Sequence, residues 1–176
     1  LFYGDVSDYE STGKMIAEIE SKYGHIDTLV NNAGITRDGR LINMKVEDWH
    51  AVINTNLNSV FNCTRQVIQG MIDRNFGRII NISSVNGQRG QFGQTNYSAA
   101  KAGMHGFTKS LAMEVAKYGV TVNTISPGYI GTDMVMAVPE KVLNQIVAQV
   151  PMGRLGGTHE VAHLVSFLAS EETSFI

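Results

Sequence analysis

Hydrophobic positions along the chain alternate between short apolar runs and longer segments in which apolar residues recur every three or four positions. The short runs have the length of buried strands, and the longer segments have the period of amphipathic helices. Strands that alternate with helices in this way are typical of βαβ units around a parallel sheet. The pattern predicts strands at residues 1–6, 26–31, 78–83 and 120–126.

Helical segments are expected between and after these strands. A capping box formed by Ser7 and Glu10 indicates the start of the first helix, and Thr95 is the expected N-cap of the third. Pro127 and Gly128 end the last strand. The helices are expected at about residues 8–23, 47–74, 96–118, 139–150 and 159–169.

The sheet type predicts where a ligand would bind. In an open parallel sheet, ligands lie beyond the carboxyl ends of the strands, because loops and helix amino-termini converge there. This rule selects four segments, at residues 5–6, 31–34, 83–94 and 127–132.

Charge and composition narrow the kind of partner. The 14 basic and 16 acidic residues give a net charge of −2, so we expect neither a nucleic-acid nor a membrane partner, but a small or mid-sized ligand. No apolar run approaches the roughly 20 residues that cross a bilayer. The lone Cys63 cannot build a disulfide framework, which favours a reducing, cytoplasmic setting. No histidine or carboxylate cluster has metal-ligand spacing, so no metal is expected.

A tyrosine and a lysine lie four residues apart at the start of the third predicted helix. Tyr97 and Lys101 therefore project from one helix face, with the ammonium close to the phenol. A free phenol has a pKa near 10, and a nearby positive charge favours its ionised form. Ser84 directly follows the strand before this helix and could hydrogen-bond the carbonyl oxygen that Tyr97 protonates.

Taken together, the motifs resemble the short-chain dehydrogenase/reductase family, in order and in spacing over nearly the whole chain. The resemblance implies a doubly wound, Rossmann-type αβα fold. It rests on NNAG at residues 31–34, Asn56 within INTNL, ISS ending at Ser84, YSAAK from Tyr97 to Lys101, and SPG at residues 126–128.

The resemblance implies a nicotinamide-dependent reduction with four catalytic residues. Tyr97 is the general acid, Ser84 orients the substrate carbonyl, and Lys101 lowers the pKa of the phenol and holds the nicotinamide ribose. Asn56 binds a water that links Lys101 to solvent. The cofactor is expected to be NADPH, with NADH left open.

The cofactor-binding residues implied by the resemblance lie on three of the four selected segments, except for Tyr97 and Lys101, which lie on the third predicted helix. Asp5 and Val6 would contact the adenine, and residues 32–34 would pass behind the adenosine ribose, where a bare glycine permits close approach. The implied residues are Asp5, Val6, Asn32, Ala33, Gly34, Tyr97, Lys101, Pro127, Gly128, Ile130 and Thr132.

Within the family, three stretches resemble the enzymes that reduce acetoacetyl-CoA. Carrier-protein reductases usually present arginines where this chain has Asn75 and Tyr118, which favours an acyl-CoA substrate. The carrier-protein thioester and a non-catalytic nucleotide-binding role remain the alternatives. Met134 and Met136 lie where the family has a mobile substrate lid. The expected substrate contacts are Asp38, Gln91, Phe92, Gln94 and Tyr129.

Some of these residues also have ordinary structural interpretations. Asn56 is compatible with a buried amide that bonds a neighbouring backbone, and Gln91 and Gln94 are compatible with polar loop residues. Ser83 competes with Ser84, but neighbouring strand residues face opposite sides, and the spacing favours Ser84. Arg89 could clamp a CoA phosphate, although a single loop arginine is commonly solvated.

The family fold contains elements that these 176 residues lack. In the family, two strands and a glycine-rich phosphate turn come first, and a seventh strand comes last. Residues 1–6 would be strand 3 of the order 3-2-1-4-5-6-7 and would have no partner. We therefore expect a single partial domain over residues 1–176, excerpted from a polypeptide of roughly 240 to 250 residues. A homotetramer built on residues 47–73 and 95–118 is also expected.

Overall fold

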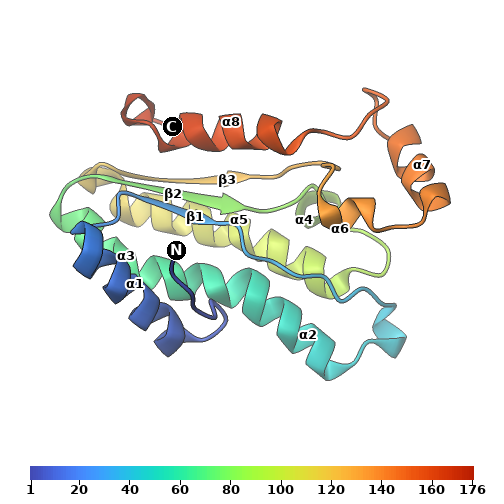
Figure 1. The fold of residues 1–176 in the computed structure, drawn as a ribbon, viewed down its shortest axis with the longest axis horizontal. Coiled ribbons are helices and arrows are strands. Elements are labelled where there is room, and N and C mark those ends of the chain that lie inside the picture. Colours follow the sequence, from blue (N-terminus) through green and yellow to red (C-terminus); the bar gives the residue numbers. More distant parts are fainter.

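A parallel sheet of three strands lies between two helical layers (Figure 1). The strands are β1 (Thr28–Asn31), β2 (Gly77–Ile82) and β3 (Val120–Ile125), in the order β1-β2-β3. The computed structural model describes residues 1–176, apart from the side chain of Met134. This arrangement confirms the predicted α/β class and its parallel sheet. The expectation of a lid at Met134 concerns a side chain outside the described residues.

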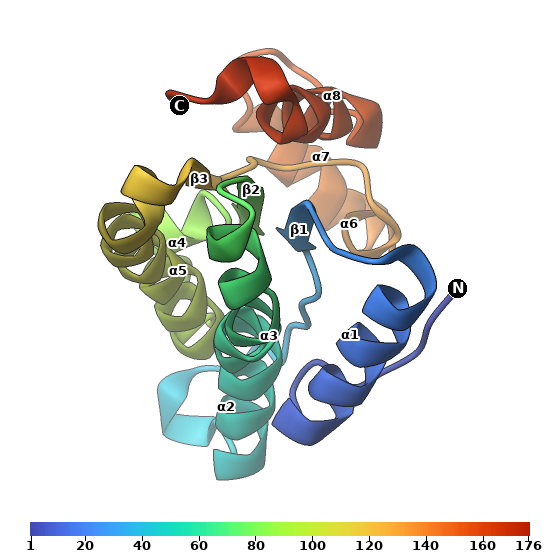
Figure 2. The ribbon, with the colours of Figure 1, turned by 90° about the vertical axis from the view of Figure 1, so that its left-hand side faces the viewer.

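Eight α-helices surround the sheet in the part of the chain that is described. They are α1 (Tyr9–Tyr23), α2 (Val46–Ile53), α3 (Ser59–Asp73), α4 (Asn86–Arg89), α5 (Thr95–Val115), α6 (Asp133–Met136), α7 (Glu140–Ala148) and α8 (Thr158–Ala169). A π-helical turn (Asn54–Asn58) joins α2 to α3, and 3-10 turns lie at Leu41–Asn43, Ala116–Tyr118 and Glu171–Thr173. Helices α3 and α5 cover one face of the sheet and α8 covers the other, while α1 packs outside α3 (Figure 2).

The first predicted strand is not formed. Residues 1–6 have no ladder partner among the described residues, and a strand without a partner leaves its backbone groups unpaired. They lie instead against α1, where a Cβ built on Gly4 would be 3.1 Å from the Met15 side chain.

The predicted capping box is also wrong. Asp8 is the N-cap of α1, and its Oδ1 accepts a hydrogen bond from the Ser11 amide at 2.6 Å. The Ser7 hydroxyl donates instead to Asp5 Oδ1 at 2.7 Å. A carboxylate is a stronger acceptor for helix amides than a hydroxyl, so Asp8 displaces the predicted cap by one residue.

Apolar side chains fill both faces of the sheet. Ile79 and Ile80 are both fully buried, and because neighbouring strand residues face opposite sides, each joins a different cluster. Burying one such side chain stabilises the fold by roughly 1.5 to 3 kcal/mol. The cluster under α3 and α5 contains Ile16, Val67, Met71, Ile79, Val115, Val120 and Val122; the cluster under α8 contains Ile80, Ile125 and Leu168.

A row of polar side chains crosses the carboxyl half of the sheet. Asn31, Asn81 and Thr124 are paired in register on the three strands. Asn31 Nδ2 donates to Asn81 Oδ1 at 2.8 Å, and Asn81 Nδ2 donates to Thr108 Oγ1 of α5 at 2.8 Å. Thr108 and Thr124 share a further hydrogen bond of 2.6 Å. Because a one-residue slip would leave these buried groups unpaired, the row fixes the strand register next to the site.

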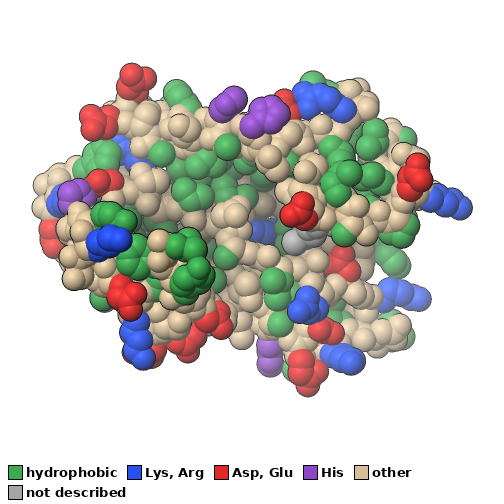
Figure 3. Space-filling model, in the orientation of Figure 1, with side chains coloured by type: hydrophobic (Ala, Val, Ile, Leu, Met, Phe, Trp, Pro, Cys, Tyr) green, Lys and Arg blue, Asp and Glu red, His purple; other side chains and the backbone are tan. Residues whose placement is uncertain are grey.

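The surface shows no dominant charge on the face seen in Figure 3, where acidic and basic side chains are interspersed around an apolar centre. Of the helices that the structure describes, none combines the length and apolar character needed to span a bilayer.

Candidate active site

The loops that follow the three strands meet at one edge of the sheet, together with α4 and α6 (Figure 1). The segment after β2 returns through α4 to the start of α5, and the segment after β3 leads to α6. The Ser83 amide donates to the Ile125 carbonyl at 2.7 Å, and the Val85 amide donates to the Pro127 carbonyl at 2.9 Å. These bonds extend the pairing of β2 and β3 into the loops and hold the site residues in fixed relation.

Tyr97 lies in the first turn of α5 and is half-buried. Its amide donates to the side-chain oxygen of Asn96 at 2.8 Å, and Asn96 Nδ2 donates to the Arg37 carbonyl at 3.0 Å. Asn96 is fully buried, so it fastens the start of α5 to the loop after β1. Asn96 was not predicted as a site residue. Its position in the first turn of a predicted helix, where asparagine commonly bonds backbone groups, could have indicated this role.

Lys101 lies one helical turn after Tyr97, with its ammonium nitrogen 5.6 Å from the centroid of the Tyr97 ring. Only 3% of the residue is exposed, and its Nζ donates to the Ile82 carbonyl at 2.6 Å. Burial lowers the pKa of Lys101 to about 8, because desolvation disfavours the charged amine.

The pKa of the Tyr97 phenol is raised above 10.0, which corrects the expectation that Lys101 would lower it. Burial is the largest cause, a hydrogen bond with the Ser84 side chain opposes it, and the Asp38 carboxylate adds to the rise. Desolvation outweighs the favourable partner because the phenolate would lose its hydration. Tyr97 therefore holds its proton at neutral pH, which is the form that an acid requires.

Ser84 and Ser83 face different neighbours. The Ser83 hydroxyl donates to the Lys101 carbonyl at 2.8 Å and lies 3.2 Å from His105 Nε2. Ser84 is the one that reaches the Tyr97 hydroxyl, and its Oγ accepts the Asn86 amide at 3.1 Å. Because its oxygen accepts from the Asn86 amide, the Ser84 hydroxyl is left to act as a donor on the side of Tyr97.

Asn56 lies in the π-helical turn, where a single uninterrupted helix was predicted. It is fully buried, and its amide pairs with the Ile35 backbone, accepting at 2.8 Å and donating at 2.9 Å. This is the ordinary structural role weighed for it. A Cβ built on Gly34 would nevertheless lie 3.5 Å from Asn56 Oδ1 and 3.6 Å from Lys101 Nζ. Gly34, Asn56 and Lys101 thus meet at one point.

The residues expected at the adenine have local hydrogen bonds. Asp5 is exposed, and its pKa is lowered by hydrogen bonds from the Ser7 side chain and amide. The Val6 carbonyl accepts from Asn62 Nδ2 of α3 at 2.9 Å. Residues 32–34 follow β1 directly, and the first two are exposed. These segments lie at the loop edge, but the structure does not join Asp5 or Val6 to the Tyr97 group by a hydrogen bond.

The residues expected at the nicotinamide form a short extension beyond β3. Ile130 makes a parallel bridge with Gly156, and the Thr132 amide donates to the Ile130 carbonyl at 2.7 Å. The Pro127 carbonyl is used by the loop after β2, and Gly128 is exposed. The bridge fixes this segment alongside the loop that precedes α8.

Of the expected substrate contacts, Asp38 lies close enough to Tyr97 to raise its pKa and is bonded to Gln94, whereas Tyr129 is bonded to Arg89. Asp38 Oδ2 accepts from Gln94 Nε2 at 2.8 Å, and Tyr129 Oη accepts from Arg89 Nη2 at 3.0 Å. Gln91 is exposed and Phe92 is 83% exposed, so both side chains point into solvent.

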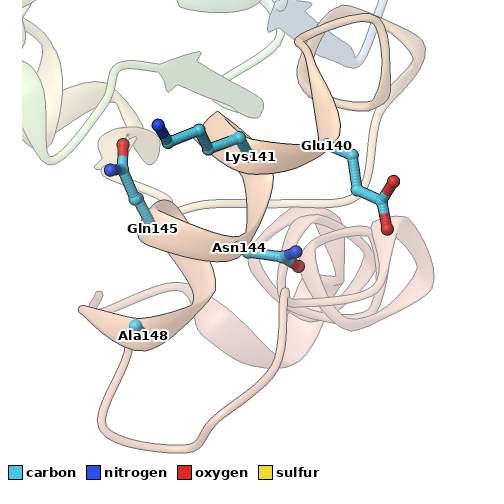
Figure 4. A pocket seen from close by; sticks show the side chains of 5 residues that line it. All are labelled: Glu140, Lys141, Asn144, Gln145 and Ala148. Carbon is cyan, nitrogen blue, oxygen red and sulfur yellow. The ribbon is translucent and has the colours of Figure 1, made fainter.

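Two surface grooves lie away from Tyr97. One runs along α7, where Lys141 and Gln145 point to one side of the helix and Glu140 and Asn144 to the other, so these polar groups do not converge (Figure 4). The other is lined by residues 154–160 and Gly131, where an exposed Arg154–Glu160 pair at 2.7 Å closes one wall. Within the described residues, no three potential metal ligands are grouped.

Comparisons with known proteins agree with the motifs. The chain matches the family described as Enoyl-(Acyl carrier protein) reductase over residues 1–176. It is 59% identical over 172 residues to the acetoacetyl-CoA reductase of Cupriavidus necator, and the aligned stretch covers 98% of this chain and 70% of that relative. It is 61% identical over 177 residues to the acetoacetyl-CoA reductase of Shinella zoogloeoides, with 100% and 73% covered. The 3-oxoacyl-(acyl-carrier-protein) reductase FabG of Escherichia coli is 51% identical over 172 residues, with 98% and 70% covered.

Proposed function

This chain belongs to the short-chain dehydrogenase/reductase family and is an NAD(P)-dependent oxidoreductase, and we propose that it reduces the 3-keto group of acetoacetyl-CoA with NADPH. One geometric observation carries the proposal: the Tyr97 phenol lies beside the Ser84 side chain and one helical turn before the buried Lys101, whose ammonium nitrogen is 5.6 Å from the centroid of the Tyr97 ring. The two relatives named as acetoacetyl-CoA reductases support the choice of substrate.

Tyr97 is the acid of the proposed reaction. With its pKa raised, the phenol carries its proton at neutral pH and can transfer it to the carbonyl oxygen as that oxygen gains charge. The Ser84 hydroxyl, which acts as a donor on the side of Tyr97, would donate to the same oxygen and fix the direction of the carbonyl. Both donors belong to rigid elements, since Ser84 follows β2 and Tyr97 begins α5.

The residues present fit a nicotinamide cofactor. The Lys101 ammonium donates one hydrogen bond to the Ile82 carbonyl, and its other N–H groups can donate to ribose hydroxyls. Gly34 leaves open the space beside that ammonium, 3.6 Å from Nζ, which a side chain would enter. A bound dihydronicotinamide supplies the hydride. The residues proposed to hold it are Asp5, Val6, Asn32, Ala33, Gly34, Pro127, Gly128, Ile130 and Thr132, with Tyr97 and Lys101.

Asn56 is proposed to serve the proton supply of Lys101. One lone pair of its Oδ1 accepts the Ile35 amide and the second remains free. Since Gly34 brings Asn56 and Lys101 to one point, a water held there would connect the ammonium to solvent.

The carrier-protein thioester is the second candidate substrate, favoured by the 51% identity to FabG. Asn75 and Tyr118, which replace the arginines of carrier-protein enzymes, precede β2 and β3 and lie at the sheet edge opposite Tyr97. A carrier bound at these residues would therefore not face this chain's own Tyr97. The preference for the CoA ester therefore rests on the relatives rather than on these two residues.

A kinetic comparison tests the function. The full-length protein is expected to oxidise NADPH with acetoacetyl-CoA faster than with acetoacetyl carrier protein, and faster than it oxidises NADH. Tyr97→Phe should lower kcat by roughly 10² to 10⁴, whereas the matched Tyr118→Phe at the far edge should not. Absence of turnover combined with tight NADPH binding in a titration would instead indicate a nucleotide-binding protein without catalysis.

We extend the proposal to a cytoplasmic homotetramer. Phe61 of α3 and Met113 of α5 are 52% and 85% exposed, and apolar side chains on these helices suit subunit contacts. The buried, free Cys63 is compatible with a reducing compartment. Light scattering coupled to gel filtration measures the assembly, and a monomeric mass would contradict it.

A further inference from the structure

Five polar side chains form a continuous run of hydrogen bonds that begins at Asp38, the carboxylate that helps to raise the pKa of Tyr97. Asp38 Oδ2 accepts from Gln94 Nε2 at 2.8 Å, and Gln94 Oε1 accepts from Asn86 Nδ2 at 3.0 Å. Asn86 Oδ1 accepts from Arg89 Nε at 3.4 Å, and Arg89 Nη2 donates to Tyr129 Oη at 3.0 Å. The run joins the loop after β1, the segment around α4 and the loop after β3, which are far apart in sequence.

The two charged members fix the direction of the run. A carboxylate such as Asp38 only accepts, and a guanidinium such as Arg89 only donates. Each amide between them therefore has one orientation that satisfies both neighbours. The direction also decides what Tyr129 offers: because its oxygen accepts from Arg89, its proton is free to be donated to a ligand.

Asn86 is the centre of this run and is 8% exposed. Its side chain bonds Gln94 on one side and Arg89 on the other, and its backbone amide donates to Ser84 Oγ at 3.1 Å. One residue thus contacts the carbonyl-orienting serine and both halves of the substrate-side polar surface. The guanidinium of Arg89 also lies 5.6 Å from the centroid of the Tyr129 ring, which strengthens that half.

We propose that Asn86 is a positioning residue that holds the side chains of Gln94 and Arg89, and through Arg89 that of Tyr129, in place for the acyl thioester. The inference rests on the proposed function of this site. Asn86 acts through its neighbours: the loss of its amide polarity disorders the groups that grip the substrate, while Tyr97 and Lys101 keep their geometry. The effect therefore falls on KM for the thioester more than on kcat.

Asn86→Asp tests the direction of the run at almost constant volume. An aspartate accepts but does not donate, so Gln94 lies between two carboxylates and must turn its oxygen toward one of them. KM for acetoacetyl-CoA is expected to rise roughly tenfold or more, with a smaller change in kcat. Adding Asp38→Asn supplies an amide donor at residue 38 and restores the original number of carboxylates. The Gln94 amide can then rotate, so that its oxygen accepts from residue 38 and its nitrogen donates to residue 86. The double variant should recover most of the lost kcat/KM.

Gln94→Glu is the second variant, because it lies at the loop end of α5 and places a carboxylate against Asp38 without changing the buried residue. It too should raise KM, and the same Asp38→Asn change should relieve it. Asn123→Asp is the matched control: it removes one hydrogen bond of 3.0 Å, to the Ile176 carbonyl, at a site remote from Tyr97. Its KM should equal that of the wild type.

The outcomes separate this inference from the proposed function. A wild-type protein without turnover of acetoacetyl-CoA would overturn the proposed function. An active wild type whose Asn86→Asp variant keeps its KM, or whose defect Asp38→Asn does not relieve, would overturn the role of Asn86 alone. Equal melting temperatures of the single and double variants would show that rescue acts on the site and not on folding.

Discussion

The ammonium nitrogen of Lys101 lies 5.6 Å from the centroid of the Tyr97 ring, and burial moves the pKa values of the two groups in opposite directions. It lowers that of Lys101 to about 8 and raises that of Tyr97 above 10.0. As the pH rises, Lys101 therefore loses its proton first. We therefore expect the amine, and not the phenol, to set the alkaline limit of activity in the free protein.

This order predicts the pH dependence of the reaction. The proposed role of Lys101 needs its ammonium form, which is present below a pH of about 8 and is lost above it. We expect kcat/KM for acetoacetyl-CoA to fall as the pH rises through about 8, with the slope of a single ionisation. Lys101→Arg, whose guanidinium keeps its charge, should be slower but should move the limb to higher pH. A profile that stays level past pH 9, or a limb that Lys101→Arg leaves in place, would contradict the assignment.

Burying Lys101 also costs stability, which Lys101→Met should reveal. A pKa lowered from 10.5 to about 8 corresponds to roughly 3 kcal/mol against folding with the charged amine. The 2.6 Å hydrogen bond to the Ile82 carbonyl offsets roughly 1 to 3 kcal/mol of this. We expect Lys101→Met to abolish turnover and to raise the free energy of unfolding by about 1 kcal/mol at neutral pH.

The pH dependence of that gain has a definite sign. The folded pKa is below the unfolded value, so the cost is complete below a pH of about 8 and disappears as the pH rises toward 10.5. In urea unfolding, the wild type should therefore gain stability relative to Lys101→Met as the pH rises from about 8 toward 10.5. A variant that is clearly less stable than the wild type at neutral pH would show that the hydrogen bond outweighs desolvation.

Local pattern identified the strands because their apolar runs are short and buried. β1, β2 and β3 begin and end within two residues of the predicted limits. Residues 1–6 have the same apolar character but no strand beside them in the described chain, and pairing is a property that a single segment does not encode. The interruption of the long helix at Asn56 was missed because a π turn changes one hydrogen-bonded ring and leaves the apolar period almost intact.

In the site too, contacts within one segment could be predicted from the sequence, whereas contacts between distant segments could not. The spacing of Tyr97 and Lys101 on one helix predicted that the two would lie together. Alternation along the strand allowed only one of Ser83 and Ser84 to face Tyr97, and the spacing favoured Ser84. The run through Asn86 was not predicted, because it depends on amide orientations set by Asp38, from another loop. The raised pKa of Tyr97 was missed for a related reason, since burial depends on the whole fold.

Gly87 is where α4 packs against α5 most closely. A Cβ at this position would lie 2.8 Å from the Lys101 carbonyl carbon and 2.9 Å from the Ala102 amide nitrogen. These are backbone atoms, so α4 or α5 must shift to relieve the overlap. We expect Gly87→Ala to lower the free energy of unfolding by about 1 to 3 kcal/mol and to reduce kcat/KM by displacing Lys101 relative to Ser84.

Gly106→Ala is the matched control on the exposed side of α5, where nothing lies within 4 Å of the new Cβ. It should stabilise the protein by roughly 0.5 to 1 kcal/mol, because alanine loses less backbone entropy in a helix. Chemical denaturation and steady-state kinetics of both variants measure the difference. If both substitutions changed the free energy of unfolding and kcat/KM equally, α4 and α5 would be able to separate at Gly87 at little cost.

Arg78 holds together the edge of the sheet opposite Tyr97. It is 2% exposed, and its guanidinium donates to the carbonyls of Ser170 at 3.0 Å, Gly119 at 3.2 Å and Glu171 at 3.4 Å. Two of these carbonyls follow α8, so a single side chain in β2 satisfies the end of that helix and the turn before β3. The Phe76 ring lies under the guanidinium, 4.5 Å from its carbon.

Arg78→Met should therefore be one of the more destabilising substitutions in the chain while leaving the chemistry intact. It fills a similar volume but leaves several buried carbonyls without donors, for a loss of roughly 2 to 4 kcal/mol. Arg78→Lys should lose nearly as much, because one ammonium does not reproduce the planar fork. Arg74→Met, which removes a more exposed guanidinium bonded to one carbonyl at 2.7 Å, should cost about 1 kcal/mol or less. Because Arg78 acts at the far edge, KM for acetoacetyl-CoA should stay at the wild-type value wherever the variant is folded; a changed KM would mean that the two edges of the sheet are coupled.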